Sequence, residues 1–124
     1  MAAILIVDDS PSMRRMVSFA LSEAGHRVTE AEDGRNALAT TAQEAADLVV
    51  SDMNMPGMSG IELVGELRRL PAYRSIPILM LTTETSDDMK SRARSAGASG
   101  WIVKPFDPER LIGIVNRLLG NRPS

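Results

Sequence analysis

The sequence predicts an α/β fold in which a doubly wound parallel sheet of five strands carries five helices. Short apolar runs alternate with amphipathic stretches along the 124 residues, as expected when each strand is followed by a crossover helix. The length suits one domain, with residues 1–124 forming a single unit. The chain has no cysteine, so apolar packing has to stabilise the core, and a disulfide, a thiolate metal site or a cysteine nucleophile is excluded.

The first strand and helix are predicted from the start of the chain. Ala3–Val7 is an apolar run without polar alternation, which is typical of a strand covered on both faces. Ser10 can cap the following helix, and Pro11 is tolerated at its first position. Gly25 is the residue type that commonly follows a helix end. Between these signals, apolar residues recur at helical spacing: Met13, Met16, Val17, Ala20, Leu21 and Ala24.

The middle of the chain repeats this order. Arg27–Ala31 is predicted as the second strand, residues 33–45 as the second helix and residues 47–52 as the third strand. A loop rich in glycine and proline follows, and Ser59 or Gly60 begins the third helix. The residues expected to face inward are Ala37, Leu38 and Thr41 in the second helix, and Ile61, Val64 and Leu67 in the third.

The last third of the chain supplies two more strands and two more helices. The strands are residues 76–82 and 100–104, and the helices are residues 86–95 and 108–119. The helix at 86–95 has the weakest apolar face. In an open parallel sheet, ligands bind outside the carboxyl ends of the strands, so the functional site is expected at that edge.

Charged and polar side chains stand at the carboxyl ends of the predicted strands. They are Asp8, Asp9, Asp52, Thr82 and Lys104. Two carboxylates 4 Å apart repel by roughly 4 kcal/mol at an effective dielectric constant of 20, so the site needs positive charge. Lys104 supplies one charge, and a hard divalent cation held by oxygen ligands would supply two more. Mg²⁺ fits better than Ca²⁺, because few protein oxygens leave room for water and phosphate oxygens.

Carboxylates beside Mg²⁺ and a lysine indicate phosphoryl transfer, because an aspartate can act as the nucleophile toward phosphorus. Each residue taken alone also has a structural explanation. The first two aspartates can end a strand and cap a helix, Asp52 can form an Asx turn, Thr82 suits a strand end, and Lys104 can be a solvated lysine. Their joint position at one sheet edge favours the chemical site.

Composition excludes several other classes of protein. The formal net charge of −2 gives no electrostatic footprint for nucleic acid, and no apolar run approaches the ~20 residues of a membrane span. The first nine residues lack the basic region of a signal peptide, so a cytoplasmic protein is expected. The pairs Arg14-Arg15 and Arg68-Arg69 are interpreted as parts of solvated helix faces.

Four stretches in the expected order, VDDS, SDMNMPGMSG, MLTTE and GWIVKPF, make the chain resemble the receiver domain of two-component response regulators. The likeness is greatest to single-domain receivers of the chemotaxis type, and it covers residues 3–119. It implies a flavodoxin-like sheet with the strand order 2-1-3-4-5. It also implies a signalling switch that has no output domain, acts as a monomer and is not an enzyme acting on a separate substrate.

The resemblance assigns roles around the acidic edge. Asp52 corresponds to the aspartate that accepts a phosphoryl group from a histidine kinase or another phosphohistidine donor. Asp9 corresponds to a direct Mg²⁺ ligand and Asp8 to one that acts mainly through water. Asp52 and the backbone carbonyl of Asn54 complete the ligand set. Asn54 and Glu84 match positions that tune hydrolysis of the phosphorylated aspartate.

The resemblance also assigns the parts of the switch. Thr82 corresponds to the switch hydroxyl and Lys104 to the phosphate-binding lysine. Trp101 stands where the family has its switching aromatic residue, commonly Tyr or Phe, so this chain departs from the pattern in side-chain size. The peptide bond before Pro105 matches one that is cis in the family. The target-binding face is expected over residues 86–95, 100–104 and 108–119.

Other functions stay open on sequence grounds. A phosphorelay intermediate or a scaffolding pseudo-receiver would need the same fold. A phosphatase with an aspartate nucleophile would need a second aspartate two residues later, where this chain has Asn54. Neither glycine-rich nucleotide-binding motif occurs, and no helix-turn-helix for DNA follows Leu119.

Overall fold

The computed structural model describes residues 2–83 and 86–120. Its strands are β1 (Ala3–Val7), β2 (Arg27–Ala31), β3 (Leu48–Asp52), β4 (Ile78–Thr82) and β5 (Gly100–Val103). Its helices are α1 (Pro11–Glu23), α2 (Gly34–Gln43), α3 (Gly60–Arg68), the 3₁₀ turn η1 (Pro71–Tyr73), α4 (Asp87–Ala96) and α5 (Pro108–Gly120). The predicted alternation of strands and helices is confirmed.

The five strands form one parallel sheet in the order β2-β1-β3-β4-β5. This confirms the flavodoxin-like order. The order reverses at β1, between β2 on one side and β3 on the other, so the switch point lies where β1 and β3 end. Asp8 follows β1 directly, and Asp52 is the last residue of β3.

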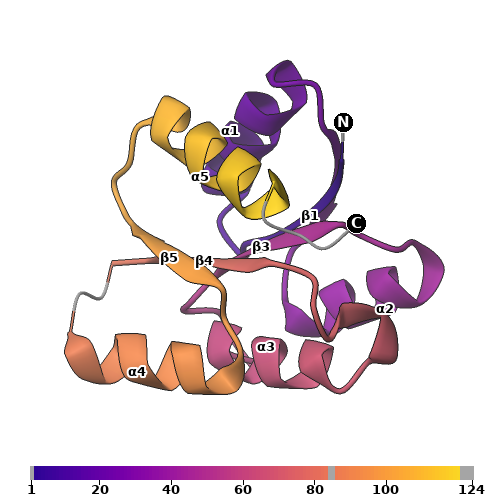
Figure 1. Ribbon diagram of the computed structural model, residues 1–124, viewed down its shortest axis with the longest axis vertical. Coiled ribbons are helices and arrows are strands. Elements are labelled where there is room, and N and C mark those ends of the chain that lie inside the picture. Colours follow the sequence, from indigo (N-terminus) through magenta and orange to yellow (C-terminus); the bar gives the residue numbers. More distant parts are fainter. Residues whose placement is uncertain (1, 84–85, 121–124) are drawn as a thin grey trace.

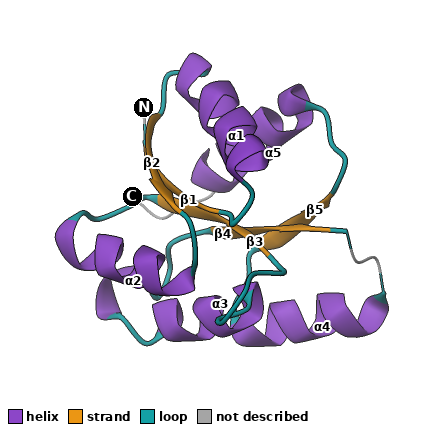
Figure 2. Cartoon of the chain, turned by 180° about the vertical axis from the view of Figure 1, so that it is seen from behind, coloured by secondary structure: helices purple, strands orange, loops and turns teal. Residues whose placement is uncertain are grey.

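Helices cover both faces of the sheet and make three layers. Helices α1 and α5 lie together on one face, and α2, α3 and α4 lie on the other (Figures 1 and 2). Neighbouring strand residues point into opposite layers. Ile4, Ile6 and Val50 belong to the core under α1 and α5, whereas Leu5 and Val49 belong to the core under the other three helices. Burial on both faces explains why the strands show no polar alternation.

The helix starts follow the capping residues in the sequence. Ser10 accepts a hydrogen bond from the Met13 backbone N–H, and Ser59 forms a capping box with Glu62. Gly25 has a φ of 94°, a left-handed conformation that suits the residue after a helix. The predicted starts of α1 and α3 are therefore confirmed.

Several local predictions were wrong. Helix α2 ends at Gln43, two residues before the predicted end, because Glu44 is extended and accepts a hydrogen bond from Thr29. On α3, Leu63 is fully buried but was not among the residues expected to face inward, whereas Ile61 is only partly buried. The turn η1 was not predicted.

The arginine pairs are also not simply solvated. Arg68 donates hydrogen bonds to the carbonyls of Tyr73, Ile76 and Gly97, and so joins α3 to η1 and to the end of α4. Arg14 makes comparable contacts near the acidic edge. None of the helices in residues 2–83 and 86–120 has the length and apolar character needed to cross a membrane.

Candidate functional site

The ends of four neighbouring strands, β1, β3, β4 and β5, bring the predicted polar residues to one edge of the sheet. Oxygen atoms of Asp8, Asp9 and Asp52 lie within 4.8 Å of one another. Thr82 ends β4 beside them, and its carbonyl accepts a hydrogen bond of 2.8 Å from the Lys104 backbone N–H. Residues that are separated by up to 96 positions therefore meet because parallel strands end at the same edge.

Lys104 is the cation that faces this cluster. Its Nζ lies 2.9 Å from Asp52 Oδ1 and 3.8 Å from Asp8 Oδ2. The first distance is a charge-assisted hydrogen bond and the second is a longer ion pair. The lysine side chain is 16% exposed, so the pairs are poorly screened by solvent.

Asp8 is fully buried and only half satisfied. Its Oδ1 accepts a hydrogen bond of 2.9 Å from the Ser10 backbone N–H, but its Oδ2 has no hydrogen-bond partner among the described residues. Burial raises the pKa of the Asp8 carboxyl above its ordinary value. The charges of Asp52 and Asp9 raise that pKa further, while the Ser10 N–H and Lys104 act against the rise.

The donor set fits a hard divalent cation. Three carboxylates and one ammonium leave two negative charges without compensation, which one Mg²⁺ would balance. All the side-chain ligands are oxygens, and Asp8 Oδ2, which accepts no hydrogen bond from the described residues, is an acceptor that a metal-bound water could satisfy. Asp9 is exposed, so solvent and solutes can reach the cluster from its side.

The remaining predicted site residues are placed as follows. Asn54 is exposed at the start of the loop between β3 and α3, two residues after Asp52. The Lys104–Pro105 peptide bond is cis. Glu84 lies outside the described residues.

The loop after Asp52 is held against the strand end by Gly60. A Cβ atom on this residue would lie far inside contact distance of the Asp52 carbonyl oxygen and close to Met80 Cε. The Gly60 N–H also donates a hydrogen bond of 2.8 Å to the Met53 carbonyl. Only glycine therefore lets α3 begin this close to the carboxylate that ends β3.

Trp101 lies half-buried on β5 and is faced by two cations of α4. Lys90 Nζ is 5.4 Å and the Arg94 guanidinium carbon is 5.3 Å from the centre of its ring. The two cations are one helical turn apart, so both reach the same side chain. These cation–π contacts stabilise the ring in its present position at the molecular surface.

Arg14 was missed as a site residue by the sequence interpretation. Its Nη1 donates a hydrogen bond of 2.7 Å to the Asp8 carbonyl, and its Nε pairs with Glu30 at 3.1 Å. The sequence signal that could have found it is its place one turn after the helix cap that follows the aspartates. Its neighbour Arg15 is exposed, as expected.

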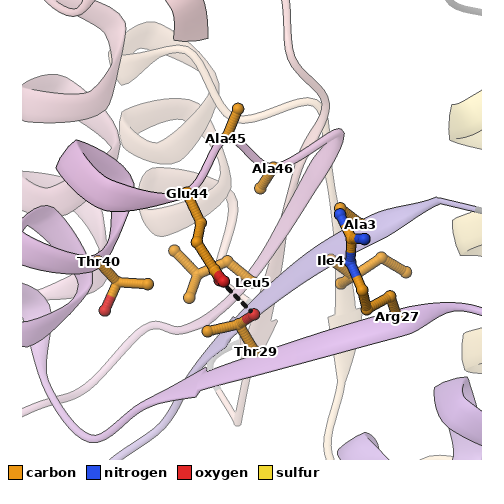
Figure 3. A pocket seen from close by; sticks show the side chains of 9 residues that line it. All are labelled: Ala3, Ile4, Leu5, Arg27, Thr29, Thr40, Glu44, Ala45 and Ala46. Carbon is orange, nitrogen blue, oxygen red and sulfur yellow. Dashed lines mark hydrogen bonds between the residues drawn. The ribbon is translucent and has the colours of Figure 1, made fainter.

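One small cavity lies at the opposite edge of the sheet, near the amino ends of β1 and β2 (Figure 3). It measures about 20 Å³ and is bordered by Ala3, Arg27 and the hydrogen bond between Thr29 and Glu44. The cavity has room for about one water molecule. It lies far along the strands from Asp52, so it is separate from the acidic site.

Comparison with known proteins gives a consistent result. The family model for the response regulator receiver domain matches residues 4–116. The Vibrio cholerae chemotaxis protein CheY-3 is 42% identical, with 93% of this chain and 92% of that protein covered. The solved structure of V. cholerae CheY4 has a TM-score of 0.93 at 49% identity, covering 95% of this chain and 98% of that one. The phosphate regulon transcriptional regulatory protein PhoB of Pseudomonas aeruginosa is 40% identical, and this chain spans 51% of its length.

Proposed function

This chain belongs to the response regulator receiver domain family, and from that premise we propose that it is a phosphorylation-activated switch whose phosphoryl acceptor is Asp52. Receiver domains are the phospho-acceptor modules of two-component signalling. The donor proposed here is the phosphohistidine of a histidine kinase. The protein would act as a single cytoplasmic receiver domain and as a monomer, and these three points stay predictions.

The observation that carries the proposal is the pairing of Asp52 with Lys104 inside the acidic cluster. Asp52 is 6% exposed, and its Oδ1 lies 2.9 Å from the Lys104 ammonium. An ordinary structural ion pair would not need two further carboxylates within 4.8 Å. An arrangement that is unfavourable until more positive charge arrives suits a site that binds a cation and then a phosphoryl group.

The proposed transfer uses the Asp52 carboxylate as the nucleophile. A carboxylate oxygen forms a bond to phosphorus as the phosphorus–nitrogen bond of the phosphohistidine breaks. The electron pair of that bond returns to the imidazole nitrogen, and the product is an acyl phosphate on Asp52. Lys104 stays beside the transferred oxygens and stabilises their charge.

Mg²⁺ would be held by Asp9, Asp52 and the backbone carbonyl of Asn54, with Asp8 acting through water. When bound, it would neutralise charge on the phosphoryl oxygens. The chain's own contribution is the position of three carboxylates and the Lys104 ammonium at one sheet edge. Later attack of water on phosphorus would release phosphate, with Asn54 and Glu84 tuning that step.

The switch proposed here couples Asp52 to β5. Thr82 lies at the end of β4, next to Val103 of β5, and would move toward the new phosphoryl oxygens. Trp101 would then turn inward from its place under α4. A groove of about 440 Å³ beside it, lined by Lys90, Phe106 and Arg110 among others, would change shape and so change the affinity for a target protein.

The test is phosphoryl transfer to Asp52→Asn from a small phosphodonor such as acetyl phosphate, and from phosphorylated kinases. We expect complete loss of Mg²⁺-dependent labelling, because an amide is not a nucleophile toward phosphorus. The fold should persist, with a free energy of unfolding in EDTA equal to that of the wild type or higher by about 1 kcal/mol, because the relief of repulsion by Asp8 and Asp9 offsets the loss of the ion pair with Lys104.

Three results would contradict the proposal. Labelling that is unchanged in the Asp52→Asn protein would place the acceptor elsewhere. A wild-type protein that accepts no phosphoryl group from any kinase or small donor would indicate a scaffolding pseudo-receiver. Turnover of small phosphoesters by the wild type would instead indicate a phosphatase.

A further inference from the structure

We propose that Arg14 is a positioning residue that holds the turn between Asp8 and Asp9 in the shape needed to bind a divalent cation. This inference rests on the proposed function, because it concerns the cation site that the phosphoryl transfer requires. It goes beyond that function in assigning to an arginine of α1 a role in cation affinity.

The contacts of Arg14 join three elements. The residue lies in α1, its Nη1 donates a hydrogen bond of 2.7 Å to the Asp8 carbonyl after β1, and its Nε pairs with Glu30 of β2 at 3.1 Å. The Arg14 side chain is only 19% exposed. A guanidinium that is fixed at both ends and largely covered has little freedom, so its contact with the carbonyl is well defined.

That carbonyl belongs to the peptide group that leads into Asp9. Because a peptide group is planar, fixing the Asp8 oxygen also fixes the direction of the Asp9 N–H and the position of its Cα. Asp8 itself is anchored by its N–H, which donates to the Ala31 carbonyl at 3.1 Å, and by the Ser10 N–H, which donates to its side chain. The contact with Arg14 adds a constraint on the exposed Asp9.

Charge alone would make Arg14 unfavourable for this purpose. A guanidinium close to a cation site repels the cation, and removal of the positive charge should tighten cation binding. The ion pair with Glu30 compensates the charge of Arg14 and leaves its hydrogen bond in place. A role in positioning and a simple charge effect therefore predict changes in cation affinity of opposite sign.

The experiment measures the affinity of the whole chain for Mg²⁺ by isothermal titration calorimetry at constant ionic strength. We expect Arg14→Met to weaken Mg²⁺ binding about 10-fold, the loss typical when a residue that orients a metal ligand is removed. The matched control is Arg15→Met, which removes the same charge from an exposed neighbour. Its Mg²⁺ affinity should be unchanged or slightly higher.

Arg14→Lys separates geometry from charge, because it keeps the charge but cannot contact the Asp8 carbonyl and Glu30 with one rigid fork. We expect its Mg²⁺ affinity to fall at least as far as that of Arg14→Met, because the positioning contact is lost and the repelling charge is kept; an affinity equal to that of the wild type would show that the charge of residue 14, and not its geometry, matters. Thermal unfolding in EDTA identifies a temperature at which every variant is folded, and the titrations are done at that temperature.

Three outcomes are decisive. Arg14→Met that binds Mg²⁺ as tightly as the wild type, or more tightly, overturns the inference. An equal loss of affinity in Arg15→Met also overturns it, because the effect would not depend on the contact with Asp8. A wild-type protein that does not bind Mg²⁺ overturns the proposed function itself, and the titration of the wild type alone reveals this.

Discussion

At the scale of single residues, the ionised carboxylate of Asp8 lowers the stability of the folded chain. The side chain is fully buried, and its Oδ2 has no hydrogen-bond partner among the described residues. Burial raises the pKa of Asp8, so its ionised form is less favourable in the folded than in the unfolded chain. The contribution of Asp8 to stability is therefore fully present below the ordinary aspartate pKa and is lost as the pH rises through the higher folded-state pKa.

This sign gives a prediction for Asp8→Asn. At about pH 7 in EDTA, the variant should have a higher free energy of unfolding than the wild type, because it carries no buried charge beside Asp52 and Asp9. The difference should shrink as the pH falls toward about 4, where Asp8 of the wild type also becomes neutral. Urea unfolding of both proteins across this range measures it. A difference that does not change with pH, or a variant that is less stable at neutral pH, would contradict the argument.

The residue scale also shows a limit of sequence interpretation. The aspartates and the lysine could be predicted, because strand ends in a parallel sheet define one edge and charge at that edge is unusual. The different fates of Arg14 and Arg15 could not be predicted from the residue type. Arg14 differs from Arg15 because it contacts the Asp8 carbonyl and Glu30. Glu30 is 16 positions away in the sequence and comes close only in the folded chain.

At the scale of elements, the start of α3 controls the position of Asp52. Gly60 and Gly65 lie on the same helix, and a Cβ would meet the Asp52 carbonyl oxygen at the first position and nothing within 4 Å at the second. The two positions therefore differ in whether they have space for a side chain. The first glycine is required by close packing, whereas the second only lowers helix propensity.

The matched substitutions Gly60→Ala and Gly65→Ala test this difference. We expect the first to lower the free energy of unfolding by about 1–3 kcal/mol, because the backbone of β3 or α3 must shift to make room. The second should raise it by up to about 1 kcal/mol through helix propensity. Urea unfolding gives both values, and phosphoryl labelling should fall only in Gly60→Ala. Equal effects of the two changes would show that the packing against Asp52 is not tight.

Elements with their own local signals were predictable, and elements that depend on tertiary contacts were not. Caps such as Ser10 and Ser59 mark helix starts because they bond to their own first turn. The turn η1 has no such cap, and its position depends on Tyr73, whose hydroxyl accepts a hydrogen bond from the Ala46 N–H. Contacts of that kind join segments far apart in the chain and leave no periodic pattern.

At the scale of the whole molecule, the question is how the proposed phosphorylation of Asp52 would affect the surface of β5. Both faces of the sheet are buried, so we expect activation to move the side chains at its edge and helix α4 rather than the strands. Moving a two-state protein from 1% to 99% active takes about 5.5 kcal/mol of differential stabilisation. Contacts that stabilise the unphosphorylated arrangement would add to the free energy that activation has to supply.

The contacts of Lys90 and Arg94 with Trp101 are of this kind if the ring turns inward on activation, as proposed. Each cation–π contact at such a site is worth about 0.5–1 kcal/mol, and both are lost when the ring leaves the surface. Replacing both cations by glutamine should therefore raise the active fraction of the unphosphorylated protein about 5- to 30-fold. Trp101 is the only tryptophan, so its emission should shift toward the blue and acrylamide should quench it less. Arg92→Gln on the exposed side of α4 is the control, and an equal response there, or none in the double variant, would show that these cations do not hold the ring.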